Sequence, residues 1–143
     1  MQRQPLPDTL MSKHKLRILL VEDHPFQLIA IQVLLNNQGY FLLTPALTAA
    51  EALEAMARAS QPYDLLLCDQ CLPDGDGLDL IEQALNLGQV RRAIVLSGLD
   101  QTCLEALEQT AAQRGLALLG CLSKPLSGPD LSRLLGATPM PES

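Results

Sequence analysis

Apolar residues in this chain fall into two kinds of segment that alternate along its length. Short runs rich in Leu, Ile and Val are typical of strands buried on both faces, and longer segments with apolar residues every three or four positions are typical of helices. The pattern predicts five strands and five helices. The predicted strands are 16–21, 40–44, 64–68, 93–96 and 116–122.

The first predicted helix follows the first strand directly. Pro25 suits its first turn, and Gly39 supplies its C-terminal stop. The apolar residues that recur at helical spacing between them are Phe26, Ile29, Ala30, Val33 and Leu34.

Three of the other four helices open on residues that cap helix N-termini. Thr48 and Glu51 form a capping box, Asp100 is a candidate N-cap, and Ser127 with Asp130 opens the last helix. The helix between the third and fourth strands is expected from about residue 77 to 87. The positions expected to face inward are Leu53, Met56 and Ala57, then Leu78, Ile81 and Leu85, then Leu104, Leu107 and Ala111, and finally Leu131, Leu134 and Leu135.

Strict alternation of strands and helices predicts an α/β fold with a doubly wound parallel sheet, because each right-handed crossover needs a covering helix. We expect a flavodoxin-like strand order of 2-1-3-4-5 with helices on both faces. Residues 16–136 would form the domain. Residues 1–15 would be a flexible tail, and residues 137–143 a second tail or the start of a linker.

Composition places the chain among ordinary globular proteins. Its 143 residues are 48% hydrophobic and 18% charged, which suits one domain with a real core. No apolar run approaches the roughly 20 residues that span a bilayer, and no signal peptide is visible, so we expect a cytoplasmic protein. A net charge of -6 argues against direct nucleic-acid binding.

Four cysteines raise the question of metal or redox chemistry. Cys68 and Cys71 have CxxC spacing, but no second CxxC or CxxH pair completes a zinc set. A redox dithiol stays open as an alternative, with packed thiols as the default in a reducing compartment.

Carboxylates follow the ends of two predicted strands. Glu22 and Asp23 come after the first strand, and Asp69 comes after the third. Ligands bind at the carboxyl ends of parallel strands where the strand order reverses, so the three should meet there. Converging carboxylates repel one another, and oxygen ligands of this kind favour a hard cation such as Mg²⁺. The pattern therefore predicts a Mg²⁺ site suited to phosphoryl chemistry.

Three further groups follow the fourth and fifth strands. Ser97 can donate a hydroxyl hydrogen bond, the Gly98 amide can approach a phosphoryl oxygen, and Lys124 offers a positive charge. Each alone has a plain structural reading, as a cap or as surface. Their occurrence at successive strand ends indicates a common site.

Four motifs together resemble the receiver domain of response regulators, the CheY-like phosphoacceptor module of two-component signalling. They are VED at 21–23, CDQCLPDGDG at 68–77, VLSG at 95–98 and SKP at 123–125. The resemblance covers about residues 16–136. Three positions depart from the usual pattern. Leu72 stands where Met is common, and Ser97 is an accepted alternative to Thr. Cys121 replaces the usual Tyr or Phe, and this change places signal readout in question.

The resemblance implies a role for each motif residue. Asp69 would accept a phosphoryl group from a sensor histidine kinase or a phosphotransfer protein. Asp23, Asp69 and the Cys71 main-chain carbonyl would bind Mg²⁺, with Glu22 acting through a water ligand. Ser97, Gly98 and Lys124 would hold the phosphoryl oxygens, and a cis Lys124–Pro125 bond would orient the lysine.

The function implied is a phosphorelay switch that catalyses only its own phosphorylation and dephosphorylation. Its partners would be the phosphodonor and a downstream effector or C-terminal output domain, with a phosphorylation-dependent homodimer as a further option. The segment LLGCLSKPL is also similar to receivers that precede cyclic-di-GMP phosphodiesterase domains. The rival reading, an Asp-nucleophile phosphatase, expects DxDx[TV] at the nucleophile, whereas Asp69 is followed by Gln70, Cys71 and Leu72.

Overall fold

The structure is a computed structural model that describes residues 15–98 and 101–136. Nearly all of the predicted N-terminal tail, the C-terminal segment 137–143 and the candidate cap Asp100 lie outside these residues.

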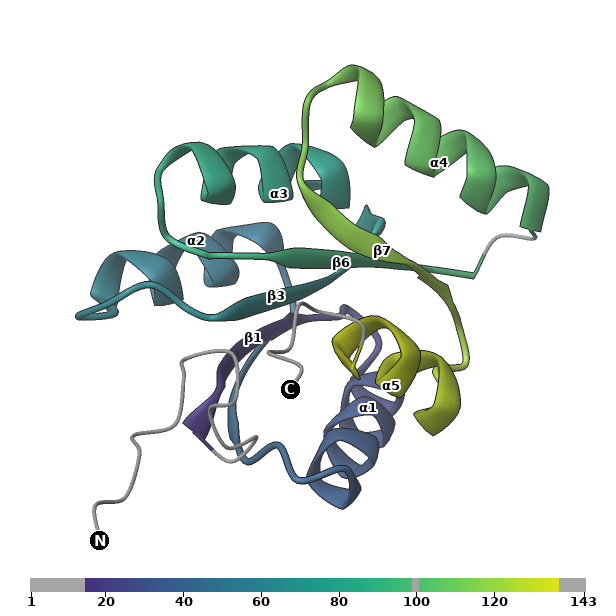
Figure 1. The fold of residues 1–143 in the computed structure, drawn as a ribbon. Helices are drawn as coiled ribbons and strands as arrows, with labels where there is room; N and C mark the ends of the chain where they lie inside the picture. Colours follow the sequence, from purple (N-terminus) through teal and green to yellow (C-terminus); the bar gives the residue numbers. More distant parts are fainter. Residues whose placement is uncertain (1–14, 99–100, 137–143) are drawn as a thin grey trace, which may run out of the picture.

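A parallel sheet of five strands forms the middle of the molecule (Figure 1). Its order is β2-β1-β3-β6-β7, which confirms the expected 2-1-3-4-5 topology. A two-stranded antiparallel hairpin, β4 and β5, lies in the loop after β3 and was not predicted. The strands are β1 (Arg17–Val21), β2 (Leu42–Ala46), β3 (Leu65–Asp69), β4 (Cys71–Leu72), β5 (Gly75–Asp76), β6 (Ala93–Ser97) and β7 (Leu118–Ser123).

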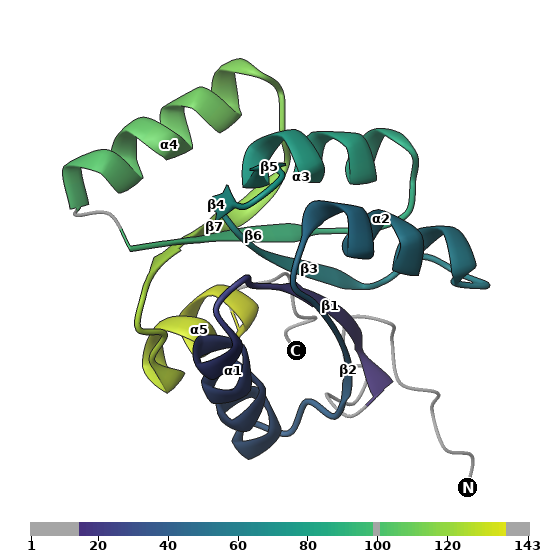
Figure 2. The ribbon, with the colours of Figure 1, turned by 180° about the vertical axis from the view of Figure 1, so that it is seen from behind.

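Helices cover both faces of the sheet, as the alternating pattern predicts. Figures 1 and 2 show α1 and α5 on one face and α2, α3 and α4 on the other. The bounds are α1 (Pro25–Asn37), α2 (Ala49–Arg58), α3 (Gly77–Asn86), α4 (Gln101–Gln113) and α5 (Gly128–Gly136).

Alternate residues of each strand supply the two cores. In β1, Leu19 and Val21 join the core under α2, α3 and α4, whereas Ile18 and Leu20 join the core under α1 and α5. Because side chains alternate across a strand, a sheet covered on both faces requires apolar residues at every position. This explains why the strands read as unbroken apolar runs.

The second strand lies two residues later than predicted, at Leu42–Ala46 rather than 40–44. Pro45 argues against a strand at these positions, because proline has no N–H for the ladder. However, β2 is an edge strand that pairs only with β1, where Pro45 lies opposite Leu20. An edge strand tolerates proline because one side of its backbone needs no partner.

The buried face of α1 differs from the apolar spacing that predicts the helix. Its buried residues are Leu28, Ile31 and Leu35. The apolar residues Phe26, Ile29 and Val33 are exposed to 87%, 55% and 52%. Ala57 of α2 was also expected inside and is exposed, whereas Leu78, Ile81, Leu104, Leu107, Ala111 and Leu131 are buried as expected.

Candidate functional site

Asp69 is the last residue of β3 and is only 4% exposed, with its carboxylate at the carboxyl end of the sheet. The chain returns past it through the hairpin and starts α3 against the end of the strand. The Gly77 amide donates to the Gln70 carbonyl at 2.8 Å. A Cβ at Gly77 would lie 2.4 Å from the Asp69 carbonyl oxygen, so only glycine fits this approach.

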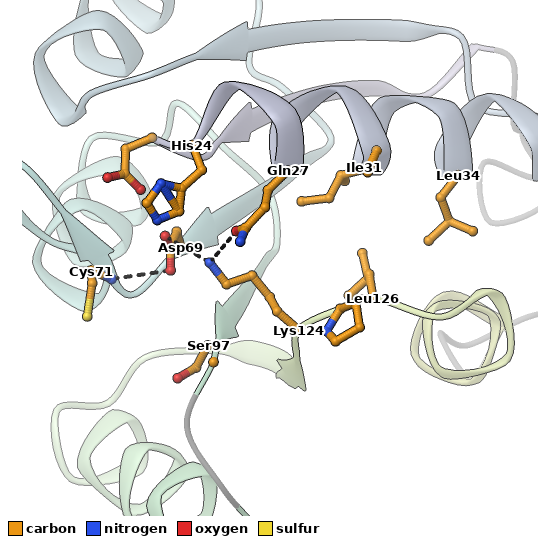
Figure 3. A pocket seen from close by; sticks show the side chains of 13 residues that line it. His24, Gln27, Ile31, Leu34, Asp69, Cys71, Ser97, Lys124 and Leu126 are labelled. Carbon is orange, nitrogen blue, oxygen red and sulfur yellow. Dashed lines mark hydrogen bonds and ion pairs between the residues drawn. The ribbon is translucent and has the colours of Figure 1, made fainter.

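Lys124 brings the ends of three strands together (Figure 3). Its Nζ lies 3.1 Å from Glu22 Oε1, after β1, and 3.2 Å from Asp69 Oδ2, at the end of β3. The Lys124 amide donates to the Ser97 carbonyl of β6 at 2.8 Å, which fixes the base of its side chain. The Lys124–Pro125 peptide is cis, as the resemblance implies.

Burial and charge act in opposite directions on these groups. Glu22 is fully buried, and this burial raises the pKa of its carboxyl although the His24 amide and Lys124 lower it. Burial alone would lower the pKa of Lys124. The hydrogen bond to Glu22 and the charges of Asp69 and Glu22 outweigh it, so the pKa of Lys124 is raised. The ammonium is therefore firmly charged between the two carboxylates.

A group of potential metal ligands lies beside this ion pair. Ligand atoms of Glu22, Asp23 and His24 lie within 4.8 Å of one another, and Asp69 is outside that group. The Cys71 amide donates to Asp69 Oδ1 at 3.3 Å, which places the start of β4 against the carboxylate. Carboxylate oxygens in excess of the single lysine fit a hard divalent cation such as Mg²⁺.

The remaining predicted residues face a common pocket of about 540 Å³. Asp23, Asp69, Ser97, Gly98 and Lys124 all line it, whereas the fully buried Glu22 lies behind the lining and contacts two residues that line it, Lys124 and His24. A Cβ added at Gly98 would meet nothing within 4 Å, so the backbone there is open to the pocket. The other lining residues are His24, Gln27, Ala30, Ile31, Leu34, Cys71, Pro125 and Leu126.

Sequence reasoning missed three side chains that shape the site. Gln27 Oε1 accepts a hydrogen bond from Lys124 Nζ at 3.1 Å, and its signal is a polar residue in the first turn of an apolar helix. His24 joins the metal-ligand group. Asp74 accepts from the Ala49 and Ala50 amides at 2.8 and 2.9 Å, and these bonds lower its pKa and attach the hairpin to α2.

The CxxC pair does not form a matched dithiol. Cys68 is buried and Cys71 is exposed, and both are free thiols. Burial raises the pKa of the Cys68 thiol far above its usual value, so it resists forming the reactive thiolate. Cys68 is instead a packed core residue.

The sheet order and the acidic pocket at its carboxyl edge define a doubly wound α/β signalling domain of the CheY-like type. The family profile described as the response regulator receiver domain matches residues 18–135. The chain belongs to this family.

Similar proteins and structures agree with this assignment. The chain is 33% identical over 136 residues to the sensor protein TorS of Escherichia coli. The match covers 92% of this chain but 14% of that protein. It is 32% identical over 123 residues to the cyclic di-GMP phosphodiesterase RocR of Pseudomonas aeruginosa, and this match covers 84% of this chain and 30% of that protein. The chain therefore spans well under half of these relatives.

Solved receiver domains have the same fold. The response regulator receiver domain protein from Methanospirillum hungatei has a TM-score of 0.68 at 28% identity, covering 85% of this chain and 90% of that one. A receiver domain protein from Clostridium thermocellum has a TM-score of 0.71 at 22% identity, and the match covers 85% of this chain and 91% of that one. At this identity the likeness supports the fold alone. Within residues 15–98 and 101–136, no helix has the length and apolar character needed to cross a membrane.

Proposed function

We propose that residues 16–136 act as a phosphoacceptor receiver and that Asp69 takes the phosphoryl group. The observation that supports this most strongly is the shared ammonium of Lys124, which contacts Glu22 and Asp69 from a third strand end. A buried carboxylate that lines a pocket beside a lysine ammonium is suited to attack a phosphoryl group.

The chemistry requires one bond to form and one to break. A carboxylate oxygen of Asp69 attacks the phosphorus of a phosphohistidine, the P–N bond breaks, and the imidazole nitrogen keeps the electron pair. The product is an aspartyl phosphate. Lys124 then leaves the carboxylate for a phosphoryl oxygen, and the Ser97 hydroxyl and Gly98 amide donate to the others.

The acidic residues would hold Mg²⁺ in this site. Asp23, Asp69 and the Cys71 carbonyl would bind it directly, with Glu22 acting through a water. When bound, the ion neutralises charge on the phosphoryl oxygens. The fit rests on the donor chemistry, because three carboxylates gather here, whereas Lys124 is shared by only two of them, Glu22 and Asp69.

The partners follow from the phosphoryl transfer. A sensor histidine kinase or phosphotransfer protein would supply the group, and the phosphorylated domain would change its contact with an effector. That effector is either a separate protein or an output domain of a longer chain, since relatives such as RocR are much longer than this chain. A phosphorylation-dependent homodimer is a further form of the same readout.

Acetyl phosphate with Mg²⁺ tests the assignment directly. The protein should gain the mass of one phosphate, and hydroxylamine should remove it because an acyl phosphate is labile to this nucleophile. Asp69→Asn should gain nothing, whereas Asp130→Asn on α5 should behave as wild type. Phosphate retained by Asp69→Asn would move the acceptor to another residue.

A further inference from the structure

The pocket at Asp69 is longer than a phosphoryl group needs. Its polar end holds Asp69 and Lys124, and an apolar end continues between α1 and the segment after β7. Figure 3 shows Ile31 and Leu34 on α1 and Leu126 across from them, on the side of Lys124 away from Asp69. Ala30 and Pro125 complete this end, which we name the apolar groove.

We propose that the apolar groove is a subsite for the hydrocarbon chain of a small phosphodonor, a medium-chain acyl phosphate. The inference rests on the proposed function of Asp69. It concerns which small molecules reach that residue, and it is separate from transfer by a protein partner.

The shape and chemistry of the pocket carry this inference. At about 540 Å³ it has the size and character of a small-ligand site, with apolar walls and a few convergent polar groups. Acetyl phosphate would fill only the polar end. A longer acyl chain attached to the same phosphoryl group would reach the apolar groove and cover the partly exposed Leu34 and Leu126.

Gln27 lies where the two ends of the pocket meet. It accepts from Lys124 Nζ at 3.1 Å, so this bond spans from α1 to the end of β7. The two ends already belong to one pocket, and the ammonium of Lys124 has three N–H donors, so it can bond a phosphoryl oxygen beside Gln27. The phosphoryl group and the chain can then occupy the pocket together.

The reaction balances without a further reactant. A carboxylate oxygen of Asp69 bonds to phosphorus, and the bond from phosphorus to the acyl oxygen breaks. The electron pair stays on that oxygen. The products are the aspartyl phosphate and a free medium-chain carboxylate.

Chain length supplies the test. Hexanoyl phosphate has four more carbons than acetyl phosphate and nearly the same leaving group. If each added methylene is about half buried, the half-saturating concentration of hexanoyl phosphate should be about tenfold lower than that of acetyl phosphate. This ratio corresponds to about 1.4 kcal/mol of binding free energy. If acetyl phosphate reacts and hexanoyl phosphate shows no advantage, the groove proposal is wrong and the phosphoacceptor proposal stands. If neither phosphorylates Asp69, the phosphoacceptor proposal itself fails.

Substitutions on α1 locate the chain. Ala30→Leu should fill part of the apolar groove and reduce the hexanoyl-to-acetyl ratio by at least threefold, whereas Ala30→Ser, of similar size, should keep it. Val33→Leu adds bulk on the exposed face outside the pocket and should also keep the ratio. An equal ratio in Ala30→Leu and Val33→Leu would place the chain elsewhere.

A binding measurement removes the reaction from the test. Hexylphosphonate cannot transfer its phosphorus, and it should compete with acetyl phosphate at about a tenfold lower concentration than methylphosphonate. It should also shift the amide signals of Leu34 and Leu126, which methylphosphonate should leave in place. Equal competition by the two phosphonates, without shifts at Leu34 and Leu126, would overturn the proposal.

Discussion

Replacing Lys124 with Met tests the electrostatic account of the site. Met keeps most of the aliphatic stem and removes the ammonium, which lies 3.1 Å from Glu22 and 3.2 Å from Asp69. The two carboxylates then lose the cation that they share. We expect lower stability in metal-free buffer, because like charges remain close together in a buried place.

The size of the loss follows from burial. Removing one partner of a fully buried ion pair costs about 3–5 kcal/mol. Here the Lys124 side chain is 14% exposed, and Glu22 can accept a proton when its cation is gone. We therefore expect a loss of about 2 kcal/mol at about pH 8.

The loss should depend on pH in a defined direction. Burial holds the folded-state pKa of Glu22 above its ordinary value of 4.5, so its contribution to stability is full below that pH and falls as pH rises through the folded pKa. Without Lys124 that pKa rises further, which enlarges the fall. The raised pKa of Lys124 adds stability that is full below the ordinary value of 10.5 and is lost only as pH rises through the folded-state pKa, so it adds no pH dependence between pH 5 and 8.

Urea unfolding with a metal chelator measures the effect. The difference between wild type and Lys124→Met should be about 2 kcal/mol at about pH 8 and less than about 1 kcal/mol at about pH 5. The exposed Lys15→Met is the matched control and should change little. Adding Glu22→Gln to Lys124→Met should recover part of the loss. A difference that stays constant from pH 5 to 8 would refute the reasoning.

Three other predictions address the metal, the backbone and the switch. Mg²⁺ at ten times its dissociation constant should add about 1.4 kcal/mol of stability. Asp23→Ala should raise the metal-free melting midpoint and abolish this response; a wild type that melts no lower than the variant without metal would contradict the repulsion argument. Gly77→Ala should cost about 1–3 kcal/mol in urea unfolding, because its Cβ meets the Asp69 carbonyl at 2.4 Å, and a loss below about 0.5 kcal/mol would show that α3 can move away. Beryllofluoride, a phosphoryl mimic, should shift amide signals in the Asp69 loop far more than at 118–122, because the half-buried Cys121 has little surface to withdraw; large shifts throughout 118–122 would overturn this.

The sequence alone determined the alternation of elements and the strand-end positions of the site residues. Unbroken apolar runs require strands covered on both faces, and parallel strands place their following residues at one edge. This is why Asp69, Ser97 and Lys124 could be assigned to one pocket from sequence. Local capping signals also held, since Thr48 Oγ1 accepts from the Glu51 amide at 3.0 Å.

The tertiary structure decided which of several apolar faces is buried. Helix α1 has apolar residues on nearly every side, so its sequence cannot choose between Leu28, Ile31 and Leu35 and the exposed set with Phe26 and Val33. Only packing against the sheet and α5 makes the choice. The edge position of β2 likewise decided that Pro45 could lie in a strand.

Contacts between segments far apart in the chain also could not be predicted from the sequence. Gln27 meets Lys124 across 97 positions, and Asp74 accepts from Ala49 and Ala50 at the start of α2. Such pairs depend on the angle at which each helix leaves the sheet, which no local pattern encodes. The sequence therefore determined which groups gather at the carboxyl edge of the sheet. The tertiary structure decided which partner each side chain takes, because those partners are fixed by packing between elements far apart in the chain.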